Sequence, residues 1–574
     1  MNAARLLALY KRIAEAPDVV ARLRRFVLDL AVRGKLVPQD ARDEPASMLL
    51  KRIRAAKGQR SQRDADPTTS DVADPFELPI GWAWTSVGEV CSKTGSGSTP
   101  RGGREVYAAS GVPFLRSQNV YDDGLRMDDV AYIDEATHGR MAGSAVRPGD
   151  LLLNITGGSI GRCCRIPQQF AEANVSQHVA ILRPAVEGMQ GFLHALIRSP
   201  YFQAFVVGEQ TGAGRGGLPK NRMDRIAVAL PPLAEQHRIV AKVDELMALC
   251  DRLEAAQTAR EATRDRLAAA SLARLNTPDP ETFPSDARFA LDVLPALTTR
   301  PDQIKPLRQT ILNLAVRGKL VPQDAGDEPA AALIRRTPAP PRPARFDSRS
   351  PELIPGDCGL SINDPHSPLP RGWEWAPLIR IARLESGHTP SRSRPDWWGG
   401  DVPWIGLVDA RLHNNGVIHE TLQTTNPEGL ANSAARLLPK GTVCFSRTAS
   451  VGYVVIMGRP MATSQDFVNW VPTEAIASEW LQLVMIAERP AIRRFSKGAV
   501  HQTIYYPAWL SMHVALPPLA EQHRIVAKVN ELMALCDALE ASLAAATTAR
   551  TRLLEATLAE ALVPAAAQEL EAAE

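Results

Sequence analysis

The sequence has little of what builds a metal or redox centre. Its 574 residues include seven cysteines, an odd number, and no pair of CxxC motifs frames a zinc site. This favours free thiols in a reducing compartment. We expect Cys163 and Cys164 to pack in a strand, and Cys250 and Cys536 to pack along helices.

Long apolar runs are also missing. No run approaches the roughly 18 residues that a membrane-spanning helix needs, and the first twenty residues carry charges throughout, unlike a signal peptide. These absences predict a cytoplasmic protein with no membrane partner. Lys+Arg (66) barely exceed Asp+Glu (63), giving a net charge of +3. Positive side chains would therefore have to gather on one face to hold nucleic acid.

Catalytic motifs are absent as well. The sequence has no GxxxxGK[ST] phosphate loop, no HExxH, no GxSxG and no Asn/Asp-Pro-Pro-aromatic methylase tetrad. GAGRGG at 212–217 fits GxGxxG, but it neither follows a strand nor opens a helix. His237 and His523 occupy matching positions, where we expect them to face solvent or a partner. We predict no catalytic residue, no metal site and no cofactor bound by this chain.

What the sequence does have is a repeat. Residues 30–46 return at 314–330 with one difference, and residues 228–255 return at 514–541 with two. The segments between these blocks share only short matches, which predicts one fold used twice with a rebuilt surface. The fixed blocks would meet the same partner, or each other, twice. The matches are GWAW at 81–84 with GWEW at 372–375, Ser98-Thr99-Pro100 with His388-Thr389-Pro390, Val112-Pro113-Phe114 with Val402-Pro403-Trp404, and Ser176-Gln177 with Ser464-Gln465.

The second block predicts a long helix in each copy. A Pro-Pro pair suits the first helical position, and apolar residues follow at alternating steps of 4 and 3, which is a heptad pattern. Each helix would continue to near Arg274 or Leu562, roughly 60 Å at 1.5 Å per residue. Acidic and basic residues are balanced along it, which favours a protein partner over DNA. The predicted seam residues are Ile239, Val243, Leu246, Cys250 and Leu253, and Ile525, Val529, Leu532, Cys536 and Leu539.

The repeated blocks resemble those of a known family. LPPLAEQHRIVAKV opening a long helix twice, RGKLVPQD after a short helix, and GWxW followed by STP and VPFLR resemble the specificity subunits of type I restriction–modification systems. The resemblance covers nearly the whole chain. The complete N-terminal helical block makes this chain closer to a straight tandem repeat than many members, and leaves open which helices pair.

The resemblance implies an α+β fold with a pseudo-twofold internal repeat. Two mixed α/β target-recognition domains would be joined and spaced by long helices that form an antiparallel coiled coil. Each domain would read one half of a bipartite, asymmetric site on double-stranded DNA. Two methylation subunits, carrying S-adenosylmethionine for adenine N6 methylation, would dock on the helices. Restriction subunits, which use ATP and Mg, would join them. The chain itself would catalyse nothing.

The domain boundaries follow from the repeat and from composition. The predicted parts are an N-terminal helical region (1–54), a linker (55–74), the first recognition domain (75–230), the first long helix (231–275), a linker with a central helical region (276–336), a proline-rich linker (337–365), the second recognition domain (366–516), the second long helix (517–562) and a disordered tail (563–574).

We expect contacts with DNA from Arg, Lys, Thr, Asn, Gln and similar side chains in loop-like stretches rich in Gly, Ser or Pro, because these side chains make most phosphate and base contacts. The candidate DNA-contacting residues are Thr99, Arg101, Arg104, Arg116, Gln118, Asn119, Arg215 and Lys220 in the first domain, and Thr389, Arg392, Arg394, Arg447, Lys497, His501 and Gln502 in the second.

Two other functions stay open: a two-headed protein-binding scaffold without a DNA role, and a fused enzyme.

Overall fold

The chain folds into two compact units. The computed structural model describes residues 1–57, 76–100, 103–208, 217–277, 279, 281–341, 368–498 and 502–562. The first unit contains Met1–Arg260 and Thr547–Glu574, and the second contains Glu261–Ala546. Most of the predicted linkers, the tail 563–574 and nearly all of GAGRGG lie outside the described residues.

The first unit holds a mixed α/β domain that runs from β1 to β12 and is here called head 1, together with helices from the repeated blocks. Its helices are α1 (Ala3–Ile13), α2 (Val19–Val32), α3 (Ala46–Lys57), α4 (Val87–Val90), α5 (Glu135–Arg140), α6 (Gln190–Arg198), α7 (Pro200–Gly208), α8 (Lys220–Asp224) and the start of α9 (Leu233–Asn276). Its strands are β1 (Ala83–Ser86), β2 (Cys91–Ser96), β3 (Val112–Leu115), β4 (Val120–Tyr121), β5 (Gly124–Leu125), β6 (Ala131–Ile133), β7 (Ala145–Val146), β8 (Leu151–Asn154), β9 (Cys163–Arg165), β10 (Ala173–Val175), β11 (Val179–Pro184) and β12 (Ala227–Leu230).

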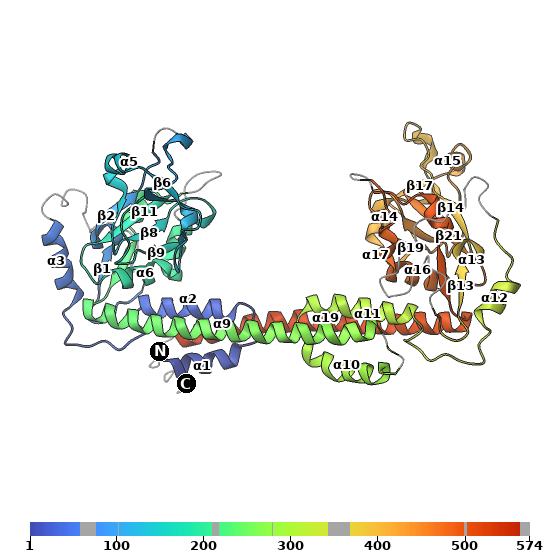
Figure 1. Ribbon diagram of the computed structural model, residues 1–574, viewed down its shortest axis with the longest axis horizontal. Helices are drawn as coiled ribbons and strands as arrows, with labels where there is room; N and C mark the ends of the chain where they lie inside the picture. The colour runs from blue at the N-terminus through green and yellow to red at the C-terminus, as the bar shows by residue number, and fades with distance from the viewer. Residues whose placement is uncertain are drawn as a thin grey trace. The chain divides into compact units, whose positions relative to one another are not determined.

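Two four-stranded sheets form the core of head 1. Their orders are β2-β11-β8-β9 and β6-β3-β10-β7, with β3 and β10 parallel. Strands β8 and β9 are built from buried side chains, including both cysteines of the Cys163-Cys164 pair, as the sequence predicts. β1 pairs with β12 where the chain enters and leaves the head. α6 packs on β9 and on α2, so one helix joins the sheet to the conserved helices (Figure 1).

The second unit repeats this plan around head 2. Its helices are α10 (Phe283–Leu297), α11 (Ile304–Val316), α12 (Ala330–Arg336), α13 (Leu378–Ile381), α14 (Leu407–Leu412), α15 (Pro427–Ala431), α16 (Ser478–Ala487), α17 (Arg489–Arg493), α18 (Tyr506–Leu510) and most of α19 (Leu519–Leu562). Its strands are β13 (Glu374–Pro377), β14 (Ala382–Ser386), β15 (Trp398–Ile405), β16 (Val417–Ile418), β17 (Gln423–Thr425), β18 (Val443–Ser446), β19 (Val454–Met457), β20 (Ala462–Thr463), β21 (Phe467–Pro472) and β22 (His513–Leu516).

Head 2 repeats the main strand pairings of head 1. The order β14-β21-β18-β19 matches β2-β11-β8-β9, and the pairs β13-β22 and β15-β20 match β1-β12 and β3-β10. α16 packs on β18, β19 and α11, as α6 does in head 1. Head 2 differs in having β16 beside β19, and in having three strands, β17-β15-β20, where head 1 has the four strands β6-β3-β10-β7. The prediction of one fold used twice is therefore confirmed.

Within the first unit, the start of α9 and the end of α19 run antiparallel. Contacts along α2 set both directions, because α2 lies antiparallel to α9 and parallel to α19 (Figure 1). The contacts are Arg24 with Asp251 (2.6 Å), Gln39 with Glu235 (3.2 Å), Arg22 with Glu555 (3.6 Å) and Lys35 with the Leu562 carbonyl (2.7 Å).

In the second unit the two long helices exchange roles: the end of α9 and the start of α19 also run antiparallel. Here α11 lies parallel to α9 and antiparallel to α19. The contacts are Arg300 with Asp265 (2.9 Å), Asn313 with Asn276 (2.9 Å), Arg308 with Asp537 (2.7 Å) and Gln323 with Glu521 (3.1 Å). Each unit thus contains helical segments from both copies of the repeat.

Burial along the predicted seam differs at one position. The other seam residues of α9 and α19 are buried or half-buried, but Leu539 is 36% exposed whereas its counterpart Leu253 packs against the first core. Leu539 is therefore corrected as a packing residue of its own unit, while its contact with a partner subunit stays a prediction.

The helices α1 and α10 pack differently. α1 joins the main core of the first unit, whereas α10 forms a small separate cluster with Leu272 and Leu275.

One described helix, α19, is long and apolar enough to cross a membrane by length and composition alone, and a single helix of this kind is weak evidence. Its apolar residues Ile525, Val529 and Cys536 lie in the core of the second unit, and Leu554 lies in that of the first. The helix therefore has a packing role in both units.

The fixed blocks meet each other at a junction below head 1. α2 ends at Val32, and Gly34 follows with φ +66°, the left-handed conformation of a helix C-terminal cap. A Cβ atom on Gly34 would lie 2.3 Å from Pro79, so close packing also requires glycine. Gln39 donates to the Gly34 carbonyl (2.8 Å) and to the buried Glu235 carboxylate, which also accepts from Trp82 Nε1 (3.0 Å).

The second unit contains the same junction, contact for contact. Gly318 has φ +65°, and the Glu521 carboxylate accepts from Trp373 Nε1 (3.1 Å) and from Gln323 Nε2 (3.1 Å). An ion pair supports each junction: Asp43 with Arg238 and Asp327 with Arg524, both at 2.6 Å. Of the two explanations for the fixed blocks, contact with each other is thus observed.

Removing the junction carboxylate is expected to destabilise its unit. In Glu235→Ala, the buried Trp82 indole loses its acceptor, which should lower the free energy of unfolding by about 2–3 kcal/mol. Burial raises the pKa of Glu235, so the neutral Glu235→Gln variant should lose less. Urea denaturation measures both. Glu245→Ala, at a half-exposed site on the same helix, should change stability little, and an equal loss there would contradict the assignment.

Candidate nucleic-acid interface

The short sequence matches of head 1 come together at one corner. Gly97 lies so close to β10 that a Cβ atom there would be 1.8 Å from the Val175 carbonyl oxygen. This close approach places Thr99 against Gln177, and the Thr99 hydroxyl donates to the Gln177 side-chain carbonyl. Both side chains are exposed, although the strand before Gln177 is buried. The loop is therefore seated on the core while its polar tips face solvent.

Head 2 has the same corner. A Cβ atom on Gly387 would lie 1.9 Å from the Ser464 carbonyl oxygen, and the Thr389 hydroxyl donates to the Gln465 side chain. The backbone of the following loop is also matched, because Ser176 N donates to Leu115 O (2.9 Å) and Ser464 N donates to Ile405 O (3.0 Å). We call Gly97, Thr99 and Gln177 corner 1, and Gly387, Thr389 and Gln465 corner 2.

The side chains around the two corners differ. In head 1, Gln177 Nε2 lies 3.2 Å from His178 Nε2, and His178 Nδ1 lies 2.6 Å from Thr156 Oγ1. In head 2, Arg447 donates to the Gln465 backbone carbonyl (3.0 Å) and lies over the Tyr506 ring (4.8 Å). Sequence reasoning missed Gln177, His178 and Thr156. The repeated Ser-Gln match was the signal that pointed to Gln177.

A tight loop borders each corner at the same topological position. Thr156 bridges to Gly217 in head 1, and Thr448 bridges to Thr503 in head 2. The next residue is left-handed in both, with φ +76° at Gly157 and +61° at Ala449. A left-handed alanine carries backbone strain, which typically persists where the surrounding structure fixes a functional loop.

The other predicted residues of head 1 have intramolecular partners. Arg116 donates to the Asp129 carbonyl (3.0 Å), and Gln118 donates to the Asp129 carboxylate (2.6 Å). Lys220 pairs with Asp224. Asn119 is buried, and its side chain accepts from Arg116 N and donates to Arg126 O. Asn119 is therefore a structural residue, and its predicted DNA contact is corrected.

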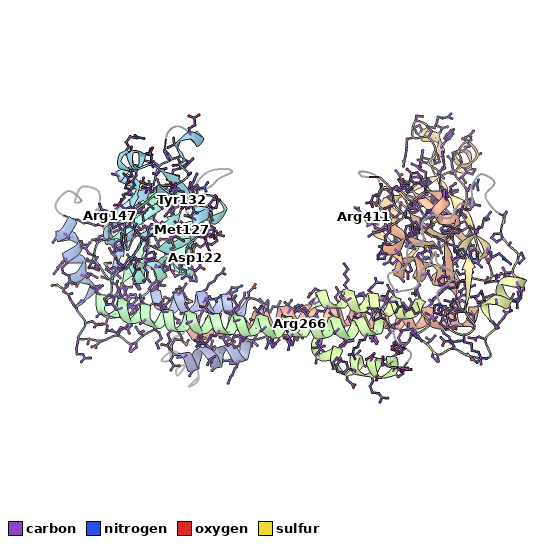
Figure 2. All side chains as sticks on the ribbon, in the orientation of Figure 1. Asp122, Met127, Tyr132, Arg147, Arg266 and Arg411 are labelled. Atoms are coloured by element: carbon purple, nitrogen blue, oxygen red, sulfur yellow. The ribbon has the colours of Figure 1, made fainter. Side chains whose placement is uncertain are left out.

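Some predicted residues of head 1 cannot be placed, and others were missed. Arg101, Arg215 and the Arg104 side chain lie outside the described part of the chain. Two other arginines stack on Tyr121 of the β4–β5 hairpin: Arg162, just before β9, lies 4.6 Å from the ring centroid, and Arg126, just after β5, lies 5.0 Å from it and pairs with Asp123 (2.6 Å). Figure 2 marks Asp122 in the turn of this hairpin and Met127 just beyond β5.

In head 2, the predicted residues fall into two groups. Near corner 2, the Gln502 carbonyl accepts from Ala449 N (3.0 Å), and the side chains of Gln502 and Lys497 are exposed. In the loop after Thr389, Arg392 lies over Trp398 and Trp404, while Arg394 lies over Trp397 and pairs with Asp396. His501 lies outside the described residues. No cluster of three potential metal ligands occurs among the residues that the structure describes.

The sequence model for the "Type I restriction modification DNA specificity domain" matches this chain twice, at residues 79–263 and 370–546. These matches cover more than half of the chain. The chain belongs to this specificity family. Each match spans one head and continues into the long helix that follows it, so the family assignment agrees with the duplicated architecture.

Two type I specificity subunits are similar to this chain along nearly their whole length. The EcoAI specificity subunit of Escherichia coli is 26% identical over 91% of this chain and 90% of its own. The EcoEI subunit of Escherichia coli is 26% identical over 94% and 93%. The crystal structure of the HsdS subunit from Thermoanaerobacter tengcongensis covers 84% of this chain and 98% of its own, with 20% identity and a TM-score of 0.44.

Proposed function

We propose that this specificity subunit selects the DNA site at which a type I restriction–modification complex acts. Head 1 reads one half of a bipartite, asymmetric target on double-stranded DNA, and head 2 reads the other half. The helices dock two methylation subunits for adenine N6 methylation, and restriction subunits join for cleavage. The chain itself is non-catalytic and binds no cofactor. S-adenosylmethionine, ATP and Mg are held by its partners, in the cytoplasm.

The single observation that carries this proposal is that corner 1 and corner 2 have the same geometry, whereas the side chains around them differ. Thr99–Gln177 and Thr389–Gln465 have the same geometry, so they suit a part of DNA that both half-sites have in common, such as the sugar–phosphate backbone. The neighbours differ, with His178 in head 1 and arginine and tryptophan in head 2. Side chains that differ between the heads suit base reading, because two unlike half-sites need unlike donors and acceptors.

The long helices offer matching surfaces for two copies of one partner. The repeated block exposes His237 on α9 and His523 on α19, in the same sequence context and one turn from the same junction. Each helix also carries a lysine–glutamate pair at matching positions, Lys242–Glu245 and Lys528–Glu531. Identical exposed side chains in both units support the docking of two identical subunits.

A chain with two copies of head 2 tests the proposal most directly. Residues 75–230 would be replaced by residues 366–516, which keeps the same junction chemistry beneath the new head. We expect the complex of this chain with its methylation subunits to methylate a symmetric site containing the second half-site twice. Mapping methylated adenines in DNA from cells expressing each chain measures this, with the natural chain as the control.

Two results would contradict the proposal. Transfer of labelled methyl groups by the purified chain alone would indicate a fused enzyme. An unchanged methylation map after the head exchange would mean that the heads do not read DNA. A chain that copurifies with proteins but shows no sequence-selective duplex binding would support the alternative, a two-headed protein-binding scaffold.

A further inference from the structure

Arg392 in head 2 is held in place by two tryptophans. Its guanidinium carbon lies 4.1 Å from the Trp398 ring centroid and 5.1 Å from that of Trp404. The two indoles pack edge to face, with centroids 5.2 Å apart and planes at 84°. A guanidinium stacked on two rings keeps little rotational freedom, so less entropy is lost when it binds.

The loop that carries Arg392 is itself anchored to these rings. Trp404 Nε1 donates to the His388 carbonyl (3.1 Å), and Trp398 Nε1 donates to the Ser391 carbonyl (3.3 Å). Trp404 is buried, so the loop is fixed to the core of head 2. The same loop contains Thr389 of corner 2. Arg392 is therefore positioned beside the surface that the proposed function assigns to DNA.

Unlike the three other predicted arginines whose side chains the structure describes, Arg392 has no competing partner among the described residues. Arg394, two residues along, donates to Asp396 (2.6 and 2.9 Å), and Arg116 and Arg447 donate to backbone carbonyls. Arg392 makes no hydrogen bond or ion pair with any residue that the structure describes, and it is exposed. An arginine that is ordered by stacking, with its donors unoccupied, is suited to bind an external acceptor pair.

Head 1 lacks this pair of tryptophans. Phe114 stands at the position of Trp404, and the tryptophans of the first half of the sequence are Trp82 and Trp84, neither of which matches Trp398. The tryptophan pair that holds Arg392 therefore belongs to the part of the surface that differs between heads, where base reading is expected.

Resting on the proposed function, we propose that Arg392 reads a guanine in the second half-site. The planar guanidinium fork matches the two major-groove acceptors of guanine, O6 and N7, and no other base presents two acceptors there. Trp398 and Trp404 act as positioning residues that hold the fork. The second half-site consequently contains at least one guanine whose N7 is required for binding.

Duplexes with single 7-deazaguanine substitutions test this assignment, since each removes one N7 acceptor. The complex of the chain with its methylation subunits would be titrated with duplexes substituted at each guanine of the second half-site. We expect the natural chain to lose roughly tenfold affinity at one position. Arg392→Ala should bind the unmodified duplex roughly 10- to 100-fold more weakly and be indifferent to the substitution at that position. Arg392→Lys keeps the charge but loses the rigid planar fork, and it should bind the unmodified duplex more weakly than the natural chain does.

Arg394→Ala is the matched control, because it removes a neighbouring stacked arginine that is already paired with Asp396. It should leave the 7-deazaguanine profile unchanged, as should Arg392→Ala for substitutions in the first half-site. The inference is overturned if the second half-site contains no guanine, if Arg392→Ala weakens all sequences equally, or if it keeps the natural sensitivity. A natural complex that binds every duplex alike would instead overturn the proposed function.

Discussion

Replacing Leu554 by alanine is expected to lower the stability of the first unit by about 3–5 kcal/mol. Leu554 lies near the end of α19, yet its side chain is 1% exposed and belongs to the core built from α1, α2, head 1 and the start of α9. Leucine-to-alanine changes in well-packed cores cost this much, because the lost burial adds to the cavity left behind. Hydrogen exchange of α2 amides and urea denaturation would measure the loss.

The neighbouring leucine provides a matched control. Leu553 is 48% exposed, so Leu553→Ala should change stability by less than about 1 kcal/mol. The two variants remove the same atoms from adjacent positions of one helix. Equal effects would mean that the end of α19 is not part of the first core. A large difference would establish that the second copy of the repeat completes the fold of the first.

Local sequence patterns predicted the helical parts of this fold. The Pro-Pro pairs and heptad steps placed long helices close to Leu233–Asn276 and Leu519–Leu562. Gly34 and Gly318 lie just beyond the ends of α2 and α11, and both are left-handed, as glycine at a helix C-terminal cap usually is. Cys250 and Cys536 were predicted to be core residues, and both are buried. These features depend on residues close in sequence, so periodicity and cap preferences are enough to find them.

Features that depend on contacts beyond the local pattern could not be predicted from periodicity or cap preferences. Asn119 looks like a loop residue, but the chain folds back so that its amide is buried against Arg126. Arg116 looks available, but the Asp129 backbone carbonyl, thirteen residues along, accepts a hydrogen bond from it in the fold. Exposure and pairing of a charged side chain are decided by tertiary neighbours that a linear pattern does not contain.

The junctions bear on the two explanations that the sequence left open for the fixed blocks, contact with a shared partner or with each other. Glu235, Gln39 and Trp82 are held by one another within the unit, which is the second explanation. Their preservation therefore follows from internal packing. Identity at exposed positions such as His237 and His523 remains the narrower argument for a shared partner, because packing does not explain it.

Gly97→Ala is expected to disable the proposed reading surface of head 1. An added Cβ atom would lie 1.8 Å from the Val175 carbonyl oxygen and 2.5 Å from its carbonyl carbon, both in the backbone. The loop must shift to relieve this overlap, at a cost of about 1–3 kcal/mol, and Thr99 then leaves Gln177. We expect the complex with methylation subunits to bind its target roughly tenfold or more weakly, through loss of first half-site contacts.

Gly139→Ala separates this effect from a general response to alanine. Gly139 is in α5 of the same head, and a Cβ atom there meets nothing within 4 Å, so the variant should keep full binding and gain slight helix stability. Gly387→Ala should reproduce the Gly97→Ala defect in the second half-site, because its Cβ atom would lie 1.9 Å from the Ser464 carbonyl oxygen. Duplex titration with each half-site scrambled in turn distinguishes the two heads. A folded Gly97→Ala chain with natural affinity and selectivity would show that corner 1 does not contact DNA, since the loop cannot accept a side chain without moving.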